Sequence, residues 1–329
     1  MVLHTPKSSP SELPSAQHRV AYRSLGQTSL QLSNIGFGSS PLGDVFRRVE
    51  PREAQAAVHQ AIDSGINFFD VSPYYGSGLA EERLGEAVHG LRDRVVLATK
   101  CGRYGLDSFD FSAPAITSSL EGSLRRLRTN SVDLLQAHDV EFADPNQIVE
   151  ETIPTLRRLQ QQGKTRYIGI TGYSLDALLK IAARIEVDSI LTYCRYNLLI
   201  SDIDEKLIPF AMRNRIGIIN ASPLHMGLLT PQRAPAWHPA PAPVRKAASR
   251  IVALCRKRGI DPAALALRFC LEHPGVTSTL MGISTRVQVG AALAALALDL
   301  DTDLLEEIRR IAGPAYGIVW PSGREAEHA

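Results

Sequence analysis

The chain carries little net charge, which excludes partners that are recognised mainly through charge. With 36 Lys and Arg against 34 Asp and Glu, the formal charge of its 329 residues is +2. A balance this close to neutral gives no electrostatic case for a nucleic acid or an anionic membrane surface as a partner.

The chain also lacks a long apolar segment. No run approaches the roughly 20 residues that cross a bilayer, and the N-terminal segment lacks the continuous apolar core of a secretory signal. We therefore expect a cytoplasmic protein with no membrane partner. Residues 1–19 are rich in Ser and Pro, which predicts a disordered tail before a single domain over residues 20–329.

Cysteine is scarce and shows no sign of pairing. The four cysteines form no C-x-x-C motif of the kind that binds zinc. We expect buried free thiols in a reducing compartment, and no metal site. These residues are Cys101, Cys194, Cys255 and Cys270.

What the sequence does contain is a regular alternation of short apolar runs with longer amphipathic stretches, after a hairpin at Val20–Leu32 with Gly26 in its turn. The expected strands are Asn34–Gly38, Asn67–Asp70, Val95–Thr99, Val132–His138, Thr165–Ile170, Ser189–Tyr193, Ile216–Ala221 and Ser278–Met281. The expected helices are Pro51–Ser64, Ala80–Gly90, Ala113–Arg128, Asn146–Gln162, Ser174–Arg184, Asp204–Asn214, Arg245–Arg258 and Arg286–Leu296. Helix-start signals lie at Ser112, Ser174 and Asp261. Eight such repeats predict an α/β fold, a closed (β/α)8 TIM barrel with an N-terminal β-hairpin.

Two irregular segments are expected to form extended loops at the active rim. Pro231–Pro243, with Trp237, follows the seventh strand, and Tyr316–Gly323, with Trp320, lies near the C-terminus. Exposed aromatics on such loops are typical of lids. For Trp237, a hydrophobic plug that holds the loop to the barrel is an equally good interpretation, whereas we expect Trp320 to face the pocket.

Four polar residues end or follow the second, third and fourth strands. They are Asp70, Tyr75, Lys100 and His138. Taken singly, each is an ordinary exposed or structural residue. The active site of a parallel barrel lies at the carboxyl ends of its strands, so the four are expected to converge on one rim.

Together these residue types can move a proton on and off an alcohol. A phenol ionises near pH ~10, and a neighbouring ammonium lowers that pKa by roughly one to three units. Lys100 would act on Tyr75 in this way, Asp70 would keep Lys100 charged, and an imidazole at His138 would orient the reacting oxygen. The combination predicts an oxidoreductase.

Hydride transfer needs a nicotinamide or a flavin, because side chains cannot supply it. No Rossmann fingerprint follows the first strand, since Gly36–Pro41 reads G-F-G-S-S-P and lacks the third glycine. We therefore expect the cofactor to be held by barrel loops.

Five motifs resemble the aldo-keto reductase superfamily, and the likeness runs from about Tyr22 to Gly323. The motifs are G-I-N-F-F-D-V-S-P-Y-Y-G (65–76), L-A-T-K-C-G-R-Y (97–104), V-D-L-L-Q-A-H-D (132–139), G-K-T-R-Y-I-G-I-T (163–171) and A-S-P-L-H-M-G-L-L-T (221–230). The resemblance implies that Tyr75 is the general acid–base and that Asp70, Lys100 and His138 support it.

More narrowly, H-D-V-E-F (138–142), I-V-E-E-T-I-P (148–154) and W-H-P-A (237–240) resemble the L-galactose 1-dehydrogenase branch. That likeness implies oxidation of the anomeric C1 hydroxyl of an aldose, L-galactose foremost, to a lactone with NAD. Because sugar hydroxyls need several polar loop groups, the candidate substrate contacts are Arg103, Asp139, His225 and Ser322, together with the pocket-facing Trp320.

The resemblance also implies a set of cofactor contacts. They are Ser39, Asp70, Thr171, Gly172, Tyr193, Ser222, Leu224, Gly227, Gly282, Ser284 and Gln288. The family's Ser-Asn pair falls on Thr171 and Gly172, so one side-chain contact is missing. Ser284 stands near the position where NADP-preferring members carry a cation for the 2′-phosphate, so NAD is preferred to NADP. Arg286, two residues further on, would restore that cation.

Two rival functions remain open from the sequence. The same residues would serve an NADPH-dependent reductase of aldehydes or ketones, and the barrel could also be a regulatory subunit that binds nicotinamide without turnover. In each case the partner is a small molecule, and the expected assembly is a monomer or a small homo-oligomer.

Overall fold

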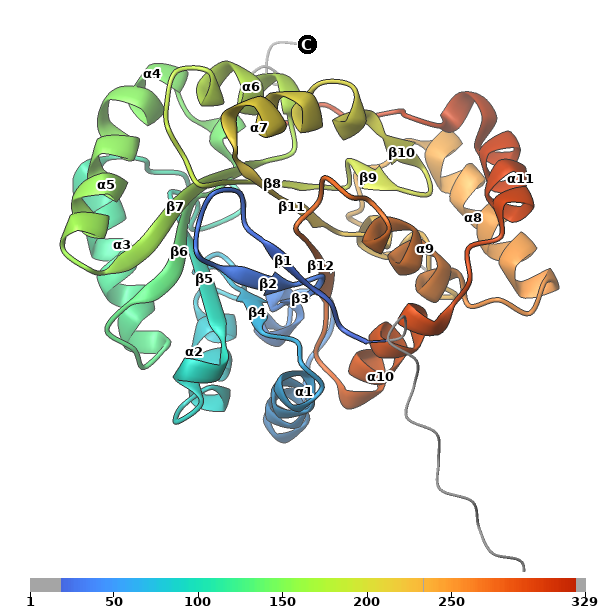
Figure 1. Cartoon of the computed structure of the whole chain (residues 1–329), viewed down its shortest axis with the longest axis horizontal. Helices are drawn as coiled ribbons and strands as arrows, with labels where there is room; N and C mark the ends of the chain where they lie inside the picture. The colour runs from blue at the N-terminus through green and yellow to red at the C-terminus, as the bar shows by residue number, and fades with distance from the viewer. Residues whose placement is uncertain (1–18, 233, 324–329) are drawn as a thin grey trace, which may run out of the picture.

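A closed barrel of eight parallel strands forms the centre of the protein (Figure 1). The structure, a computed structural model, describes residues 19–232 and 234–323; the predicted tail lies outside them except for Arg19. Around the barrel the strand order is β11-β12-β3-β4-β5-β6-β7-β8. Their bounds are β3 Ile35–Gly38, β4 Phe68–Asp70, β5 Val96–Cys101, β6 Val132–Ala137, β7 Thr165–Gly172, β8 Ser189–Tyr193, β11 Gly217–Ala221 and β12 Ser278–Gly282. The predicted TIM barrel is confirmed.

Helices surround the barrel as the amphipathic stretches predict. They are α1 Pro51–Asp63, α2 Leu79–Ala87, α3 Ala113–Arg126, α4 Pro145–Gln147, α5 Ile153–Gln161, α6 Leu175–Ala182, α7 Leu207–Asn214, α8 Ala242–Lys257, α9 Pro262–Leu271, α10 Arg286–Ala294 and α11 Thr302–Ala312. The side chains of Ser112, Ser174 and Asp261 each accept a hydrogen bond from a first-turn amide, as their sequence context predicts.

One predicted helix is interrupted. The stretch expected as a single helix over Asn146–Gln162 contains a π-helical turn, η5 Ile148–Thr152, between α4 and α5. Pro154 lies at the start of α5 and has no N–H to donate to the preceding turn, which breaks the regular α-helical ladder there.

The N-terminal hairpin closes one end of the barrel. Its strands, β1 Tyr22–Ser24 and β2 Gln31–Ser33, pair antiparallel and lie across the barrel in Figure 1. Leu25, Leu30 and Leu32 pack with the inward-facing apolar residues of the barrel strands. Gly26 is left-handed (φ 54°), and a Cβ there would lie 2.6 Å from the carbonyl oxygen of Arg215, so the turn fits closely against the barrel.

Two helices lie outside the predicted set, although the start signal at Asp261 marks the first of them, and with α8 they build a second apolar core outside the barrel. α9 lies between α8 and β12, and α11 follows α10. Apolar residues of α8, α9 and α11 pack together, and Figure 1 shows α8 and α11 standing at the edge of the ring. A further small hairpin, β9 Tyr196–Asn197 with β10 Ile200–Ser201, contributes Leu198 and Leu199 to this core.

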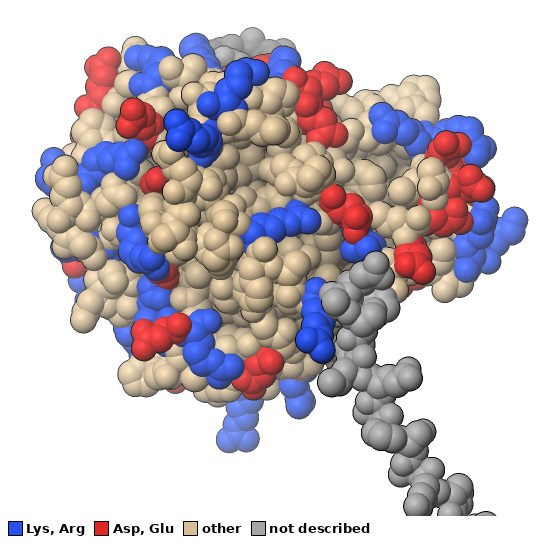
Figure 2. Space-filling model, viewed as in Figure 1, with Lys and Arg blue, Asp and Glu red and all other residues tan. Residues whose placement is uncertain are grey.

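The surface agrees with the composition. On the face in Figure 2, acidic and basic side chains are interspersed. Within residues 19–232 and 234–323, no helix combines the length and the apolar character needed to cross a bilayer. All four cysteines are buried free thiols, as predicted. Trp237 is 54% exposed and meets Phe46 at 5.8 Å between ring centroids, which does not fit a buried plug.

Candidate active site

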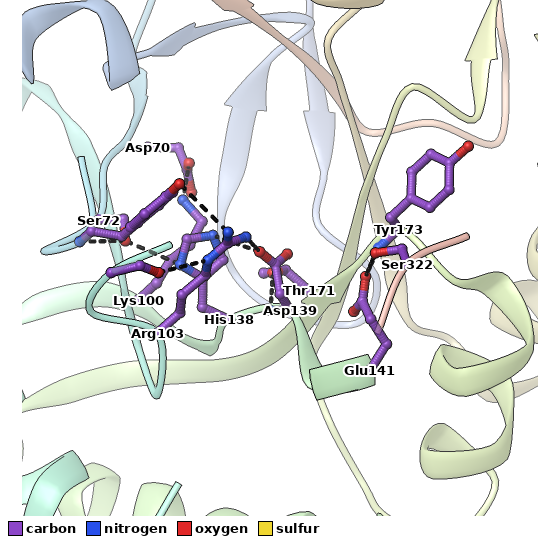
Figure 3. A network of polar contacts seen from close by, with 12 residues as sticks. Asp70, Ser72, Lys100, Arg103, His138, Asp139, Glu141, Thr171, Tyr173 and Ser322 are labelled. Atoms are coloured by element: carbon purple, nitrogen blue, oxygen red, sulfur yellow. Dashed lines mark hydrogen bonds and ion pairs between the residues drawn. The ribbon is translucent and has the colours of Figure 1, made fainter. Parts of the chain in front are cut away.

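The strand-end residues do converge. Asp70 is the last residue of β4, Lys100 lies near the end of β5, and His138 directly follows β6. These three strands are neighbours in the barrel, so their carboxyl ends share one rim. All three side chains are almost fully buried, and Figure 3 shows them gathered in one polar network.

An ion pair between Asp70 and Lys100 lies at the bottom of this site. The Lys100 Nζ also donates to the carbonyl oxygen of Val71 at 2.9 Å. Burial raises the pKa of Asp70, against the opposing effects of Lys100 and Gln136. Burial disfavours the ammonium as well, but Asp70 and Tyr75 outweigh it and raise the pKa of Lys100. Lys100 therefore remains a cation at neutral pH.

Tyr75 lies in the loop after β4, and its ring centroid is 5.0 Å from the Lys100 Nζ. The pKa of Tyr75 is raised, because burial outweighs the opposing effect of Lys100. Lys100 does lower the pKa of Tyr75 as predicted, but the predicted net direction is wrong. Desolvation of the phenolate is the larger contribution. In the protein as it stands, Tyr75 is a neutral phenol at physiological pH.

His138 is held as a neutral imidazole. Burial lowers its pKa to about 3, although Asp139 opposes the shift. Its Nδ1 lies 3.1 Å from the Ser72 Oγ, and its Nε2 lies 3.6 Å from an Asp139 carboxylate oxygen. Tyr75 meets the imidazole edge-on, at 5.9 Å and 87°.

Two of the predicted substrate contacts, Arg103 and Asp139, lie beside His138 and form an ion pair. The guanidinium of Arg103 stacks on the Tyr74 ring, 4.2 Å from its centroid. Asp139 is left-handed (φ 56°), and its backbone N–H donates to the Thr171 Oγ1 at 3.0 Å. This hydrogen bond ties the end of β6 to the end of β7.

The other three predicted substrate contacts, His225, Trp320 and Ser322, lie in or against the C-terminal segment. Figure 3 shows Ser322 with Glu141 and Tyr173, set apart from the first group. Trp320 stacks on Tyr173 at 4.4 Å and 15°, and it covers the edge of the buried His225 at 5.5 Å. The Ser322 Oγ donates to Glu141 at 3.3 Å. Burial, followed by repulsion from Asp139, raises the pKa of Glu141 to about 7.

The loop after β11 has a backbone suited to a diphosphate. Ser222, His225 and Met226 are left-handed, as is Gly227 (φ 99°), and such turns present successive amides on a concave side. Ser39 follows β3 and carries a buried hydroxyl with no partner among the described residues. These features fit a nicotinamide dinucleotide held by barrel loops.

The remaining predicted cofactor residues lie along the ends of β7, β8, β11 and β12. Thr171 is already engaged by Asp139, and a Cβ on Gly172 would lie 2.4 Å from the Glu141 Oε2. Tyr193 packs against Tyr173, with 5.5 Å between ring centroids.

At the start of α10, Gln288 completes a capping box with Thr285, and its side-chain oxygen accepts the backbone N–H of Ser284 at 2.8 Å. Leu224 and Gly282 line the same rim at the ends of β11 and β12.

The sequence analysis missed two supporting residues close to the four. The Gln136 Nε2 donates to the second oxygen of Asp70 at 3.0 Å, and Ser72 contacts His138. The spacing of both residues in the sequence could have predicted their position. Gln136 stands two residues before His138 and Ser72 two after Asp70, and residues two apart along an extended chain face the same side.

Comparison with known proteins identifies the class. The model of the Aldo/keto reductase family matches residues 34–312. The chain belongs to the aldo/keto reductase family and is an NAD(P)-dependent oxidoreductase.

Individual relatives narrow the comparison. The chain is 44% identical to L-galactose dehydrogenase of Arabidopsis thaliana, over 93% of this chain and 98% of the relative. It is 30% identical to D-threo-aldose 1-dehydrogenase of a Pseudomonas species, over 85% and 94% of the two chains. Among solved structures, aldo-keto reductase AKR11C1 from Bacillus halodurans, in its holo form, superimposes with a TM-score of 0.76 at 26% identity, covering 93% and 100%.

Proposed function

We propose that this enzyme oxidises the anomeric C1 hydroxyl of an aldose, L-galactose foremost, to the lactone with NAD. The observation that carries the proposal is the buried Asp70–Lys100 pair beside Tyr75, with a neutral imidazole at His138. The 44% identity to an L-galactose dehydrogenase over nearly the whole chain supports the substrate class. Buried free thiols are compatible with work in the cytoplasm.

Each of the four residues has a chemical task in this reaction. A bound oxidised nicotinamide would supply the acceptor for the hydride of C1. Tyr75 takes the proton of the C1 hydroxyl, and Lys100 stabilises the phenolate that must form first. Asp70 holds Lys100 in place, and neutral His138 donates a hydrogen bond to the reacting oxygen. As the C1–H and O–H bonds break, the C=O bond of the lactone forms.

The two groups of polar residues would bind the rest of the sugar. Arg103 and Asp139 adjoin His138, so they suit hydroxyl groups near C1. Trp320 and Ser322 belong to the second group and suit the far end of the sugar. His225 is buried beneath Trp320 and would act by supporting that ring.

An ion pair at the start of α10 favours NAD over NADP. Glu53, on α1, accepts the backbone N–H of Arg286 at 2.9 Å and lies 3.3 Å from its guanidinium. The cation that could grip a 2′-phosphate is therefore already paired, and a carboxylate stands beside it. A 2′-hydroxyl is accepted at such a place more readily than a phosphate.

The direct test follows the absorbance of reduced nicotinamide with L-galactose, L-fucose and D-galactose, each offered with NAD and with NADP. We expect turnover with an L-sugar and NAD. Tyr75→Phe should abolish turnover and keep cofactor affinity, while Tyr22→Phe, in the exposed N-terminal hairpin, serves as a control that keeps activity. If no sugar raises the absorbance of reduced nicotinamide with either cofactor, the proposal is refuted.

A second candidate is the NADPH-dependent reduction of aldehydes or ketones. The raised pKa of Tyr75 favours it, because a neutral phenol is the general acid that carbonyl reduction needs. Oxidation of NADPH by simple aldehydes near neutral pH, without sugar oxidation, would show that the protein is a carbonyl reductase. Cofactor binding with no turnover in either direction would leave a regulatory subunit.

A further inference from the structure

We propose that Ser72 is a positioning residue that fixes the tautomer of His138, so that Nδ1 accepts a hydrogen bond and Nε2 carries the proton. Its kinetic consequence rests on the proposed function. The tautomer itself does not, because it is a property of the protein without substrate.

Ser72 has two hydrogen-bond partners among the described residues, and together they determine which way its hydroxyl points. Ser72 is fully buried, and its Oγ accepts the backbone N–H of Tyr74 at 3.1 Å. Its other contact among the described residues is the Nδ1 of His138, also at 3.1 Å (Figure 3). A buried hydroxyl proton needs an acceptor, and Nδ1 supplies one only if it carries no hydrogen. A neutral imidazole then has its single proton on Nε2.

The surroundings of Nε2 leave that proton free for a substrate oxygen. An Asp139 carboxylate oxygen lies 3.6 Å from Nε2, beyond ordinary hydrogen-bond distance. The same carboxylate is engaged by Arg103. Burial disfavours a second proton on the ring more than Asp139 favours it, and Lys100 and Arg103 add to the effect of burial, so the imidazole stays neutral while it donates.

Ser72 lies in the same short segment of chain as two of the four catalytic residues. It stands two residues after Asp70 and three before Tyr75, so one short loop carries the acid–base residue and the support for its imidazole neighbour. Tyr75 and Tyr74 meet the ring at 5.9 Å and 6.0 Å and limit its tilt. These aromatic contacts do not determine which ring nitrogen carries the proton, whereas the hydrogen bond from Ser72 does.

The test is nitrogen NMR of the whole protein with ¹⁵N-labelled histidine. The chain has nine histidines, and His138→Asn identifies the signals of interest by their loss. We expect Nδ1 of His138 to be of the unprotonated type and Nε2 of the protonated type, unchanged between pH 5 and 9. The reverse assignment, or a doubly protonated ring in this range, would overturn the proposal.

Variants at Ser72 separate its hydroxyl from its bulk. Ser72→Ala should shift the Nδ1 resonance or populate the other tautomer, and it should lower kcat roughly three- to tenfold with a smaller change in KM. Ser72→Thr keeps the hydroxyl and should restore the spectrum and kcat. Thermal unfolding of both variants reports whether they fold.

The outcomes distinguish this inference from the proposed function. If Ser72→Ala leaves both tautomer and kcat unchanged, Ser72 is not a positioning residue. If the tautomer is as expected and responds to Ser72→Ala, but no sugar is oxidised, the inference stands and the proposed substrate class fails.

Discussion

The Nε2 of Gln136 donates a 3.0 Å hydrogen bond to Asp70, on the carboxylate oxygen that Lys100 does not engage. Because β4, β5 and β6 are consecutive in the barrel, this carboxylate is held by both of the strands that follow its own. Each of its oxygens has a donor, which is what a buried carboxylate needs if it is to stay ionised and fixed in place.

Replacing Gln136 by Met should therefore reduce activity while nearly conserving volume. One oxygen of the buried Asp70 loses its donor, and a hydrogen bond to a charged group contributes roughly 1.5–3 kcal/mol. We expect kcat/KM for the preferred substrate to fall about tenfold or more. Gln161→Met, at the exposed end of α5, is the control. Equal activity of the two variants would show that Asp70 does not depend on Gln136.

The pH dependence of turnover should reflect Tyr75 and not His138. Because the pKa of Tyr75 is raised above its ordinary value near 10, sugar oxidation should quicken with pH between 7 and 9 as more phenolate forms. The pKa of His138 is about 3, so no inflection near 6.5 is expected from it. The measurement is kcat/KM against pH at saturating NAD. An inflection near 6.5 that disappears in His138→Asn would contradict this assignment.

Glu141 should make the protein less stable as pH rises. Its pKa is raised to about 7 in the folded state, so the folded protein binds the proton more tightly than the unfolded chain, where a Glu titrates near ~4.3. The stability it contributes is full below the unfolded pKa and is lost as pH rises to about 7. Glu141→Gln should therefore gain stability relative to the parent at pH 8, by roughly 3–4 kcal/mol.

Urea unfolding of Glu141→Gln at pH 4.5 and pH 8 checks this. The advantage of the variant should be large at pH 8 and nearly absent at pH 4.5. Glu150→Gln, at an exposed position in the same segment, controls for the loss of one carboxylate. A constant difference between the parent and Glu141→Gln at both pH values would mean that Glu141 ionises normally.

Cofactor choice should respond to Glu53. Glu53→Gln removes the carboxylate beside Arg286 and frees the guanidinium, so NADP should bind roughly three- to tenfold more tightly while NAD affinity stays nearly constant. The pair is partly exposed, and the effect is accordingly modest. Equilibrium titration with each dinucleotide measures it, with Glu50→Gln as the exposed control. An unchanged affinity ratio would place the discrimination elsewhere.

The sequence by itself was enough for the barrel and for the convergence of Asp70, Lys100 and His138. Buried parallel strands appear as short apolar runs, and the residue that ends such a run lies at one known rim of the barrel. For α9 the sequence marked only the start, at Asp261, because the helix itself, P-A-A-L-A-L-R-F-C-L, is apolar on most sides and buried between neighbours. Sequence patterns predict a helix from a single apolar face, whereas α9 is apolar on several faces.

Only the tertiary structure decided the properties that depend on depth and on contacts between distant residues. Burial, which no local pattern records, made the net pKa shift of Tyr75 upward although Lys100 pulls it down. Glu53 and Arg286 are 233 positions apart and meet because the closed barrel brings α1 beside α10. Desolvation and long-range pairing arise from the packed chain as a whole, so they belong to the fold and not to any segment of the sequence.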